Sequence, residues 1–287
     1  MKELKTAGVR LPDSPLVPYP SRSLVPERDV RYAPVLEASR LGIDFGGLTA
    51  VDDFTLTIGR TEIAGLIGPN GAGKTTVFNL LTSVYQPTRG SILINGMPTA
   101  GKSTHQVSRM GIARTFQNIR LFDNLTVEEN VTAAMDSQMK YSMVSGILRL
   151  PGFWKEEKIA HERALELLSL FHMEDVANVK AGSLPYGAQR RLEIVRALAT
   201  NPSLLLLDEP AAGMNPSETA ELTETIRRIR DEFNIAVLLI EHDMSLVMGI
   251  CEGIAVLNFG RIIAKGTPDE IRNNPQVIEA YLGKKEG

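Results

Sequence analysis

The sequence predicts an α/β protein whose core is a mostly parallel β-sheet with helices on both faces. The C-terminal half alternates short apolar runs with helical patterns, as in Leu204–Leu207, Ser217–Phe233 and Ile235–Ile240. Such alternation is typical of a parallel sheet, because each return to a neighbouring strand needs a crossover, usually a helix. The runs are apolar throughout, as expected of strands buried on both faces. A glycine-rich loop over residues 68–73 joins another apolar run to a helical pattern.

The other elements follow from periodicity and turn residues. Val51–Ile58 alternates apolar and polar residues, which is strand periodicity, and a Gly46-Gly47 turn separates it from a strand at Val35–Phe45. Further strands are expected at Glu62–Ile67, Ser91–Asn95, Ile254–Leu257 and Arg261–Ala264. Further helices are expected at Lys74–Ser83, Val127–Met139, Glu156–Phe171, Gln189–Thr200 and Met244–Ile250, followed by a helical tail after residue 264.

Composition narrows the class of protein. The chain has 287 residues, 43% of them hydrophobic and 23% charged, and a net charge of -3, which gives no global attraction to nucleic acid. Its single cysteine excludes an internal disulfide and a zinc site built from several cysteines, and fits a reducing compartment. The charged N-terminal residues do not resemble a secretory signal, and no apolar run reaches the ~18 residues that a membrane span needs. We therefore expect a globular cytoplasmic protein.

Residues 1–34 are expected to form an extended arm. They hold six of the 16 prolines, and proline at this density interrupts both helices and sheet ladders. Residues 35–287 form the expected folded part, in which the segment from approximately 118 to 200 is mostly helical.

The loop at residues 68–75 matches the phosphate-binding pattern Gly-x-x-x-x-Gly-Lys-Thr, between a strand and a helix. Glycines let several backbone N–H groups point at phosphate oxygens, and the helix start adds its partial positive charge. Lys74 would bridge the β- and γ-phosphates, and the Thr75 hydroxyl would complete the coordination of Mg²⁺. The expected nucleotide-binding residues are Gly68, Pro69, Asn70, Gly71, Ala72, Gly73, Lys74, Thr75 and Thr76. The alternative is a plain glycine-rich turn.

Two adjacent carboxylates end the buried run at residues 204–207. Asp208 at the strand end would hold Mg²⁺, commonly through its water shell, and Glu209 would point the other way, toward an attacking water. As a general base Glu209 would polarise that water during cleavage of the γ-phosphate. The alternative is an acidic strand-to-loop turn without a catalytic role. The phosphate-binding loop in the same chain argues against it.

Leu184-Pro185-Tyr186-Gly187-Ala188-Gln189-Arg190-Arg191 resembles the signature loop of ABC-type ATPases, and other residues follow that family's usual order. These are Phe45 before the Gly46-Gly47 turn, Gln117, Asn215 and His242. The resemblance covers residues 35–287. It implies a P-loop NTPase fold, in which an N-terminal antiparallel β subdomain and a helical subdomain with the signature loop accompany the core sheet. It also implies ATP and Mg²⁺ as cofactors.

The resemblance assigns a role to each of these residues. Gln117 reaches Mg²⁺ or the attacking water, His242 bonds to the γ-phosphate, and Phe45 stacks on adenine. Alternatives remain: His242 as a structural histidine, Phe45 as a core residue, and Asn215 as either a helix cap or a dimer contact.

In the resembled family the signature loop binds the γ-phosphate held by a second subunit, so Tyr186 and Gly187 would contact a partner's ATP. Two ATP molecules are then held between two ATPase chains, and hydrolysis loosens the pair. Pro185 stands where the common signature has serine, which removes a hydroxyl and an N–H donor. This departure favours a heterodimer with unequal sites, although a homodimer remains possible.

Further signs are similar to the LivG-type ATP-binding subunits of bacterial branched-chain amino acid importers. They include Phe45-Gly46-Gly47-Leu48, Ile240-Glu241-His242-Asp243-Met244 and the tail at residues 277–283. The resemblance implies two transmembrane permease subunits as partners, a periplasmic solute-binding protein that acts indirectly, no nucleic acid, and a peripheral location on the cytoplasmic face of the inner membrane. The segment Tyr141–Trp154, which carries one charge, would be either a packed helical hairpin or a contact with the membrane subunit.

Other functions remain open at this stage. The solute could be urea, an amide, an aromatic acid, or a lipid or lipopolysaccharide, because the ATPase never touches it. A small-molecule kinase would use the same phosphate loop, but Glu209 beside Asp208 favours water as the acceptor. A non-transport ABC clamp usually carries coiled-coil insertions, zinc cysteines or two cassettes, and this chain shows none of these patterns.

Overall fold

The computed structural model describes residues 34–135 and 151–282. The predicted arm at residues 1–34, apart from Pro34, and the greater part of the segment at 141–154 lie outside this range.

The central element is a six-stranded sheet in the order β10-β9-β3-β8-β7-β6. All neighbouring pairs from β9 to β6 are parallel, and only β10 pairs antiparallel with β9. The prediction of a mostly parallel core sheet is therefore confirmed. Its strands are β3 (Ile63–Ile67), β6 (Ile112–Arg114), β7 (Leu204–Asp208), β8 (Ala236–Ile240), β9 (Gly253–Asn258) and β10 (Arg261–Gly266).

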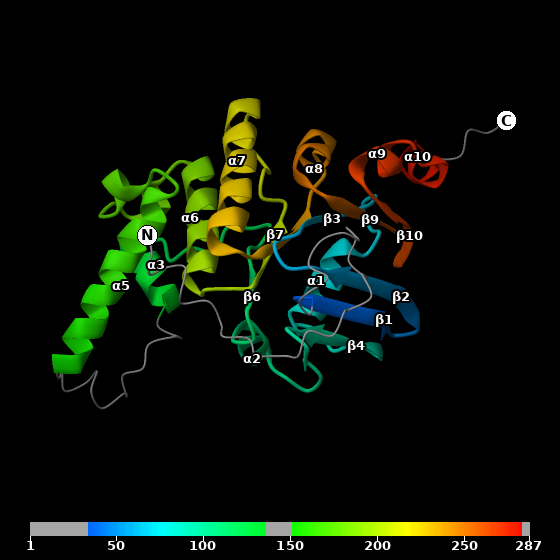
Figure 1. The fold of residues 1–287 in the computed structure, drawn as a ribbon, viewed down its shortest axis with the longest axis horizontal. Coiled ribbons are helices and arrows are strands. Elements are labelled where there is room, and N and C mark those ends of the chain that lie inside the picture. Colours follow the sequence, from blue (N-terminus) through cyan, green and yellow to red (C-terminus); the bar gives the residue numbers. More distant parts are fainter. Residues whose placement is uncertain (1–33, 136–150, 283–287) are drawn as a thin grey trace.

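A second, antiparallel sheet lies beside the first and has the order β2-β1-β4-β5 (Figure 1). Its strands are β1 (Leu36–Phe45), β2 (Leu48–Ile58), β4 (Arg89–Ile94) and β5 (Met97–Pro98). Strand β2 begins three residues before the predicted start at Val51, because the ladder continues to a pair between Phe45 and Leu48 at the turn. Leu48 is 72% exposed, so this end of the strand has no buried face that periodicity could reveal.

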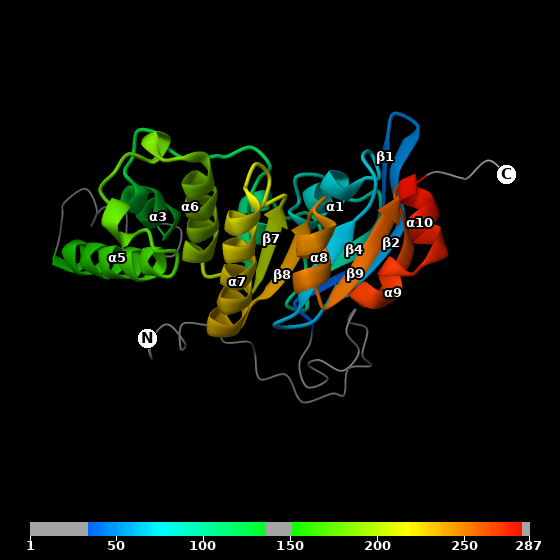
Figure 2. The same cartoon turned by 90° about the horizontal axis from the view of Figure 1, so that it is seen from above.

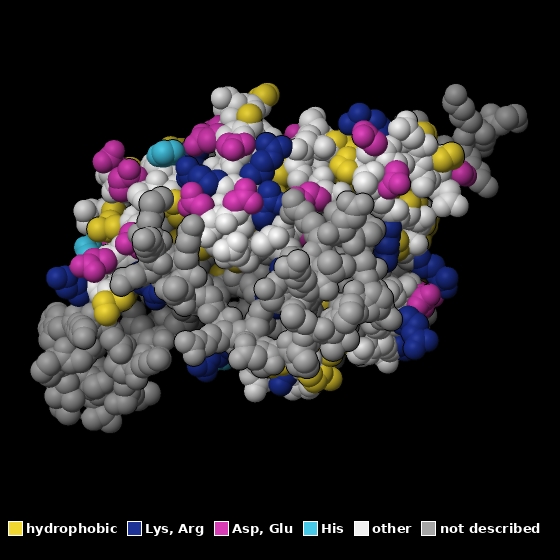
Figure 3. Space-filling view, viewed as in Figure 1, with side chains coloured by type: hydrophobic (Ala, Val, Ile, Leu, Met, Phe, Trp, Pro, Cys, Tyr) yellow, Lys and Arg dark blue, Asp and Glu magenta, His cyan; other side chains and the backbone are white. Residues whose placement is uncertain are grey.

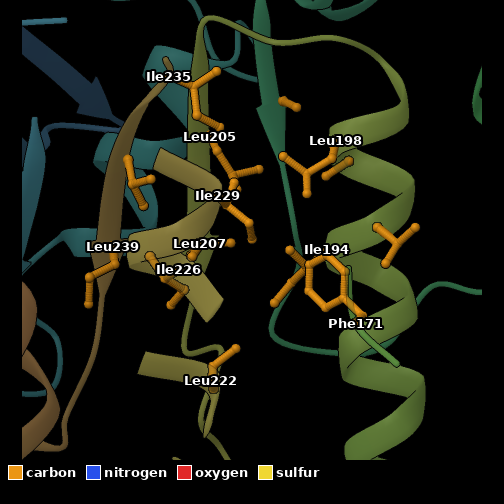
Figure 4. Close-up of a cluster of buried hydrophobic side chains, with 14 of the residues drawn as sticks. Phe171, Ile194, Leu198, Leu205, Leu207, Leu222, Ile226, Ile229, Ile235 and Leu239 are labelled. Atoms are coloured by element: carbon orange, nitrogen blue, oxygen red, sulfur yellow. The ribbon is translucent and has the colours of Figure 1, made fainter. Parts of the chain in front are cut away.

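Alternate residues of the parallel strands face two different hydrophobic clusters. In β7, Leu205 and Leu207 belong to one cluster and Leu204 and Leu206 to the other, as the period of two in a strand requires. The first cluster includes residues of α7 (Pro216–Phe233) and α8 (Met244–Ile250), and the second includes those of α1 (Lys74–Leu81). Figure 4 shows part of the first cluster, with Leu205, Leu207, Ile226, Ile229, Ile194 and Leu198.

Between β6 and β7 the chain forms a mostly helical part, which lies to one side of the sheets (Figure 2). It contains α3 (Val127–Met135), α5 (Pro151–Ser169), α6 (Tyr186–Ala199) and two 3₁₀ turns at Glu174–Val176 and Ala181–Ser183. Helix α6 starts three residues before the predicted start at Gln189, with Pro185 as its N-cap residue. Proline is suited to a helix start, because the N–H that it lacks has no partner there in any case.

The remaining helices of the described residues are short. They are α2 (Thr104–Ser108), α9 (Pro268–Arg272) and α10 (Pro275–Leu282), of which the last two form the predicted helical tail. Helix α2 and strand β5 were not predicted, because five and two residues are too few to show a period. Acidic and basic side chains are intermixed over α7 on the face in Figure 3. Within this helix Arg227 pairs with Glu224. No helix within residues 34–135 and 151–282 combines the length and the apolar character of a membrane span.

Candidate nucleotide-binding and hydrolysis site

The phosphate loop joins β3 to α1 in a conformation that requires glycine. Gly68 has a φ of 154°, and a Cβ atom there would lie 2.0 Å from the carbonyl oxygen of Leu257. Gly73 has a φ of 103° and directly precedes α1. The loop therefore has the backbone geometry that the sequence pattern predicts, with its turn at the carboxyl end of a buried parallel strand.

The start of α1 offers uncompensated backbone donors. No side chain caps this end, and the first turn has no acidic residue. Since the first N–H groups of a helix have no partner within the helix, they are available to an anion. Thr75 is exposed and Thr76 is partly exposed at this end, where they can reach a ligand.

The Lys74 side chain is buried against the loop. Its Nζ donates hydrogen bonds to the carbonyl oxygens of Gly68, at 2.7 Å, and Pro69, at 3.0 Å. Burial lowers the pKa of Lys74, while the carboxylates of Glu209 and Asp208 act in the opposite direction. A cation close to two carboxylates places the phosphate loop and the end of β7 in one site.

Glu209 lies between Gln117 and His242. Its Oε2 accepts a hydrogen bond from Gln117 Nε2 at 2.9 Å, and its Oε1 lies 2.5 Å from His242 Nε2. Glu209 has a φ of 50°, an uncommon conformation for a residue other than glycine, and such positions cluster at functional sites. The structure thus brings together the three residues that the sequence analysis predicted to be catalytic.

Asp208 has a partner that the sequence analysis missed. Its Oδ2 accepts a hydrogen bond from Arg114 Nη2 at 2.8 Å, and both side chains are almost fully buried. Arg114 also donates to the Asn79 side chain of α1 at 2.8 Å. The last residue of β6 therefore links the carboxylate at the end of β7 to the helix after the phosphate loop.

The protein side chains by themselves do not form a metal cluster. Within the described residues no group of three or more His, Cys, Asp or Glu side chains could hold a metal ion. This donor set fits Mg²⁺ bound together with a nucleotide, because Mg²⁺ is usually held by one or two carboxylates, waters and substrate phosphates. Asp208 and Thr75 are the residues that would hold it.

Helix α6, which begins with the signature residues, is separated by α7 and β7 from α1, the helix that follows the phosphate loop (Figures 1 and 2). Tyr186 begins α6 and is 47% exposed. Gly187 follows in the first turn, near the Glu218 carboxylate of α7. The structure therefore does not bring Tyr186 and Gly187 to the phosphate loop of their own chain.

The structure identifies Asn215 as a helix cap. Its side chain accepts hydrogen bonds from the N–H groups of Ser217 and Glu218, both at 3.0 Å. The Glu218 carboxylate in turn accepts a hydrogen bond from the Asn215 N–H. This reciprocal arrangement is a capping box. One of the two roles considered for Asn215 is thereby confirmed.

Phe45 is exposed at the end of β1 and is not a core residue. Its ring meets the ring of Tyr85 edge-on, with centroids 5.2 Å apart. An exposed aromatic face at this point is available for stacking against a planar ligand.

Comparison with known proteins decides the family. The family model described as "ABC transporter" matches residues 51–212. The chain belongs to this family. It is accordingly an ATPase of the ATP-binding cassette type, coupled to transport.

Two relatives and one solved structure place the cassette more closely. It is 50% identical to the high-affinity branched-chain amino acid transport ATP-binding protein LivG of Escherichia coli K12, over 88% of this chain and 98% of the relative. It is 32% identical to the lipopolysaccharide export ATP-binding protein LptB of Haemophilus influenzae, over the same shares. The ADP conformation of MJ1267, an ATP-binding cassette of an ABC transporter, has a TM-score of 0.76 at 27% identity, over 88% of this chain and 99% of that one. The family model "Branched-chain amino acid ATP-binding cassette transporter" matches residues 261–286.

Sequence reasoning missed a buried acid beside the predicted site of this cassette. Glu241 accepts hydrogen bonds from the N–H groups of Ala211, at 2.8 Å, and His242, at 2.9 Å. Burial raises the pKa of Glu241, while the N–H donors act against this shift. Glu241 thus joins the loop after Glu209 to the loop that carries His242. Its position in Ile240-Glu241-His242 was a signal, since a carboxylate directly after a buried strand needs partners.

A second missed contact comes from the C-terminal tail. The Tyr281 side chain of α10 lies near the backbone of Gly68, the first glycine of the phosphate loop: burial raises the pKa of Tyr281, and the Gly68 backbone acts against this shift. Nothing in the spacing of the sequence connects these two residues, because the contact depends on how α10 packs.

Proposed function

We propose that this cassette hydrolyses MgATP to drive the uptake of branched-chain amino acids through separate membrane subunits. The observation that carries the hydrolytic part is the Glu209 carboxylate, held between Gln117 and His242 beside the buried amine of Lys74. The amino acid class is supported by the 50% identity to LivG and by the C-terminal family match.

The phosphate loop would bind the triphosphate through backbone N–H groups and the Lys74 amine. That amine now donates to the carbonyls of Gly68 and Pro69, and phosphate oxygens would replace them as acceptors. Thr75 and Asp208 would hold Mg²⁺, which offsets the negative charge on the phosphate oxygens when it is bound. Phe45 would stack on the adenine base.

Glu209 would act as the general base for an attacking water. Its carboxylate is an acceptor whose position is fixed on both sides, by the amide of Gln117 and the imidazole of His242. A fixed acceptor favours catalysis because a misplaced base must first reorganise. His242 would in addition bond to the γ-phosphate, and Gln117 would contact the metal or the water.

The exposed Tyr186 and its neighbour Gly187 would bind the γ-phosphate held by a second ATPase subunit. In their own chain α7 and β7 separate α6, which they begin, from α1 after the phosphate loop, and this supports a site shared between two chains. Pro185, which is also exposed, provides neither a hydroxyl nor an N–H there. The partner is therefore expected to be a different chain with an intact signature.

The chain would work at the cytoplasmic face of the membrane with two permease subunits, while a periplasmic solute-binding protein delivers the solute to them. Copurification tests this part. Detergent extracts of membranes containing the tagged chain should yield a second ATPase and two membrane proteins. An ATP-dependent homodimer as stable as the mixed dimer would contradict the heterodimer.

An uptake assay tests which solute the transporter carries. In a strain that lacks its own branched-chain uptake, expression of the complete set of subunits should restore ATP-dependent accumulation of leucine, isoleucine and valine. The matched control carries Glu209→Gln and should restore none of the three. Uptake of urea, amides or aromatic acids in place of these three solutes would overturn the solute assignment without touching the ATPase assignment. Lipopolysaccharide export, the function named for LptB at 32% identity, would overturn the import direction as well.

A further inference from the structure

Arg190 connects two parts of the site through four hydrogen bonds. Its guanidinium donates to the carbonyl oxygens of Phe116, at 2.6 Å, and Gln117, to the phenol oxygen of Tyr186, at 3.0 Å, and to the Glu193 carboxylate, at 3.2 Å. The side chain is only 3% exposed. A buried cation is therefore joined to the predicted metal-binding segment and to the first residue of α6.

Glu193, one turn further along α6, completes the connection. Its Oε1 accepts a hydrogen bond from the N–H of Phe116 at 3.1 Å, so α6 binds both backbone groups of that residue. Burial raises the pKa of Glu193, while the Phe116 N–H and the charge of Arg190 act against this shift. The backbone of Phe116 and Gln117 is thus attached to α6 at three points by two side chains.

We propose that Arg190 is a positioning residue that couples the signature end of α6 to Gln117. The proposal rests on the proposed function, in which Tyr186 meets the partner's nucleotide and Gln117 serves the nucleotide of its own chain. A guanidinium is planar and holds its donors in fixed directions, so a displacement of Tyr186 cannot leave the bonds to residues 116 and 117 unchanged. Through this connection, contact at the partner's nucleotide would set the position of Gln117 against Glu209.

A purely stabilising role does not explain why the bonds of Arg190 and Glu193 converge on the backbone beside Gln117. A buried ion pair is weak support for stability, because desolvation offsets much of the attraction. The pair of Arg190 and Glu193 directs three bonds to the chain at residues 116 and 117. The neighbouring Arg191 behaves differently: it is 28% exposed and lies 3.9 Å from Glu221 of α7.

The test removes the planar set of N–H donors of Arg190 and keeps its positive charge. Arg190→Lys leaves a cation beside Glu193 but cannot reach Tyr186 and both carbonyls together. Arg227→Lys, at a partly exposed arginine of α7 outside the signature loop, is the matched control. Arg190→Met combined with Glu193→Leu fills the site with apolar groups of similar size, which keeps the protein folded while removing the connection. Each variant is measured in the assembled transporter for kcat, KM for ATP and Tm.

A second measurement needs neither turnover nor nucleotide. Deuterium exchange of the nucleotide-free chain is followed over residues 115–120. In Arg190→Lys and in the double variant, exchange there should be faster than in wild type and in Arg227→Lys. Their kcat should fall about tenfold, while KM stays within about twofold, since a positioning contact acts on the transition state more than on binding.

The outcomes separate the two proposals. If both Arg190 variants keep the wild-type kcat, or if their exchange over residues 115–120 is unchanged while Tm falls, the coupling is wrong and the ATPase assignment stands. If wild type and Glu209→Gln hydrolyse ATP at the same rate, the assigned base fails, and the coupling fails with it.

Discussion

The sheet edge and the helical part of this cassette position their functional residues by different physical means. At the sheet edge, Asp208 is the last residue of β7 and pairs with Ile240 of β8, the Glu209 N–H donates to the Ile240 carbonyl, and His242 follows β8 by two residues. The backbone of the parallel strands therefore positions these residues. In the helical part, Tyr186 and the segment around Gln117 are joined through two buried charged side chains, those of Arg190 and Glu193. Backbone hydrogen bonds between strands do not depend on which side chains are present. A connection made by side chains is lost when one of them is substituted. Substitutions at the sheet edge should therefore affect chemistry and binding, and those in the helical part should affect stability and coupling.

The largest expected effect is at the sheet edge. Glu209→Gln should lower kcat for ATP hydrolysis by about 10²–10⁴-fold, because a general base is removed. The affinity for ATP should be retained, and the closed dimer should accumulate. Steady-state hydrolysis and size-exclusion chromatography with ATP measure the two effects. Glu224→Gln, on the exposed face of α7, is the control and should be neutral. Wild-type turnover by Glu209→Gln would show that the chemistry does not depend on this residue of the sheet edge.

The next effect concerns stability in the helical part. Leu168 is fully buried in α5, and Leu168→Ala should lower the free energy of unfolding by about 2–5 kcal/mol. Ile159→Ala, at an exposed position on the same helix, should change it by less than about 0.5 kcal/mol. Urea denaturation measures both values. The folded Leu168→Ala protein should still bind ATP with wild-type affinity, and a large loss of affinity would show that the two parts are not separable in this way.

Lys74→Ala tests the electrostatics of the phosphate loop. A hydrogen bond from a charged group is worth about 1.5–3 kcal/mol, so the affinity for MgATP should fall about 10–100-fold. Titration with a fluorescent ATP analogue measures it. Lys158→Ala removes an exposed lysine of α5 and is the control. Equal affinities in the two variants would mean that the backbone N–H groups of the loop bind the phosphates without the amine.

The smallest expected effect is at the antiparallel sheet. Phe45→Ala should weaken ATP binding by about three- to tenfold, because one aromatic contact contributes about 0.5–1.5 kcal/mol. Phe259→Ala removes another exposed phenylalanine and serves as the control. The same titration gives both affinities. If Phe45→Ala binds ATP with wild-type affinity, Phe45 does not contact the adenine, and the antiparallel sheet takes no part in nucleotide binding through this residue.

Much of the sheet edge was predictable, since its signals are local. The glycine spacing at residues 68–73 and the apolar runs before Asp208 and His242 are visible in the chain itself. Strand β6 has only three residues, too few to show a period, and its last residue, the partner of Asp208, was missed. The ion pair of Arg190 and Glu193 was also missed, because charged side chains three apart on a helix usually face solvent.

The sequence by itself determined most of the strands and the phosphate loop, and it predicted the side chains proposed to be catalytic, because hydrophobic periodicity and glycine placement act over a few residues. Tertiary structure alone decided which side chains meet. Gln117 and His242 reach Glu209 from positions 92 and 33 residues away in the chain, and Arg190 reaches the Phe116 carbonyl across 74 residues. These residues meet only when the strands pack in the order β3-β8-β7-β6 and α6 packs into the same hydrophobic cluster as β7. That packing depends on the burial of apolar surface from many segments of the chain.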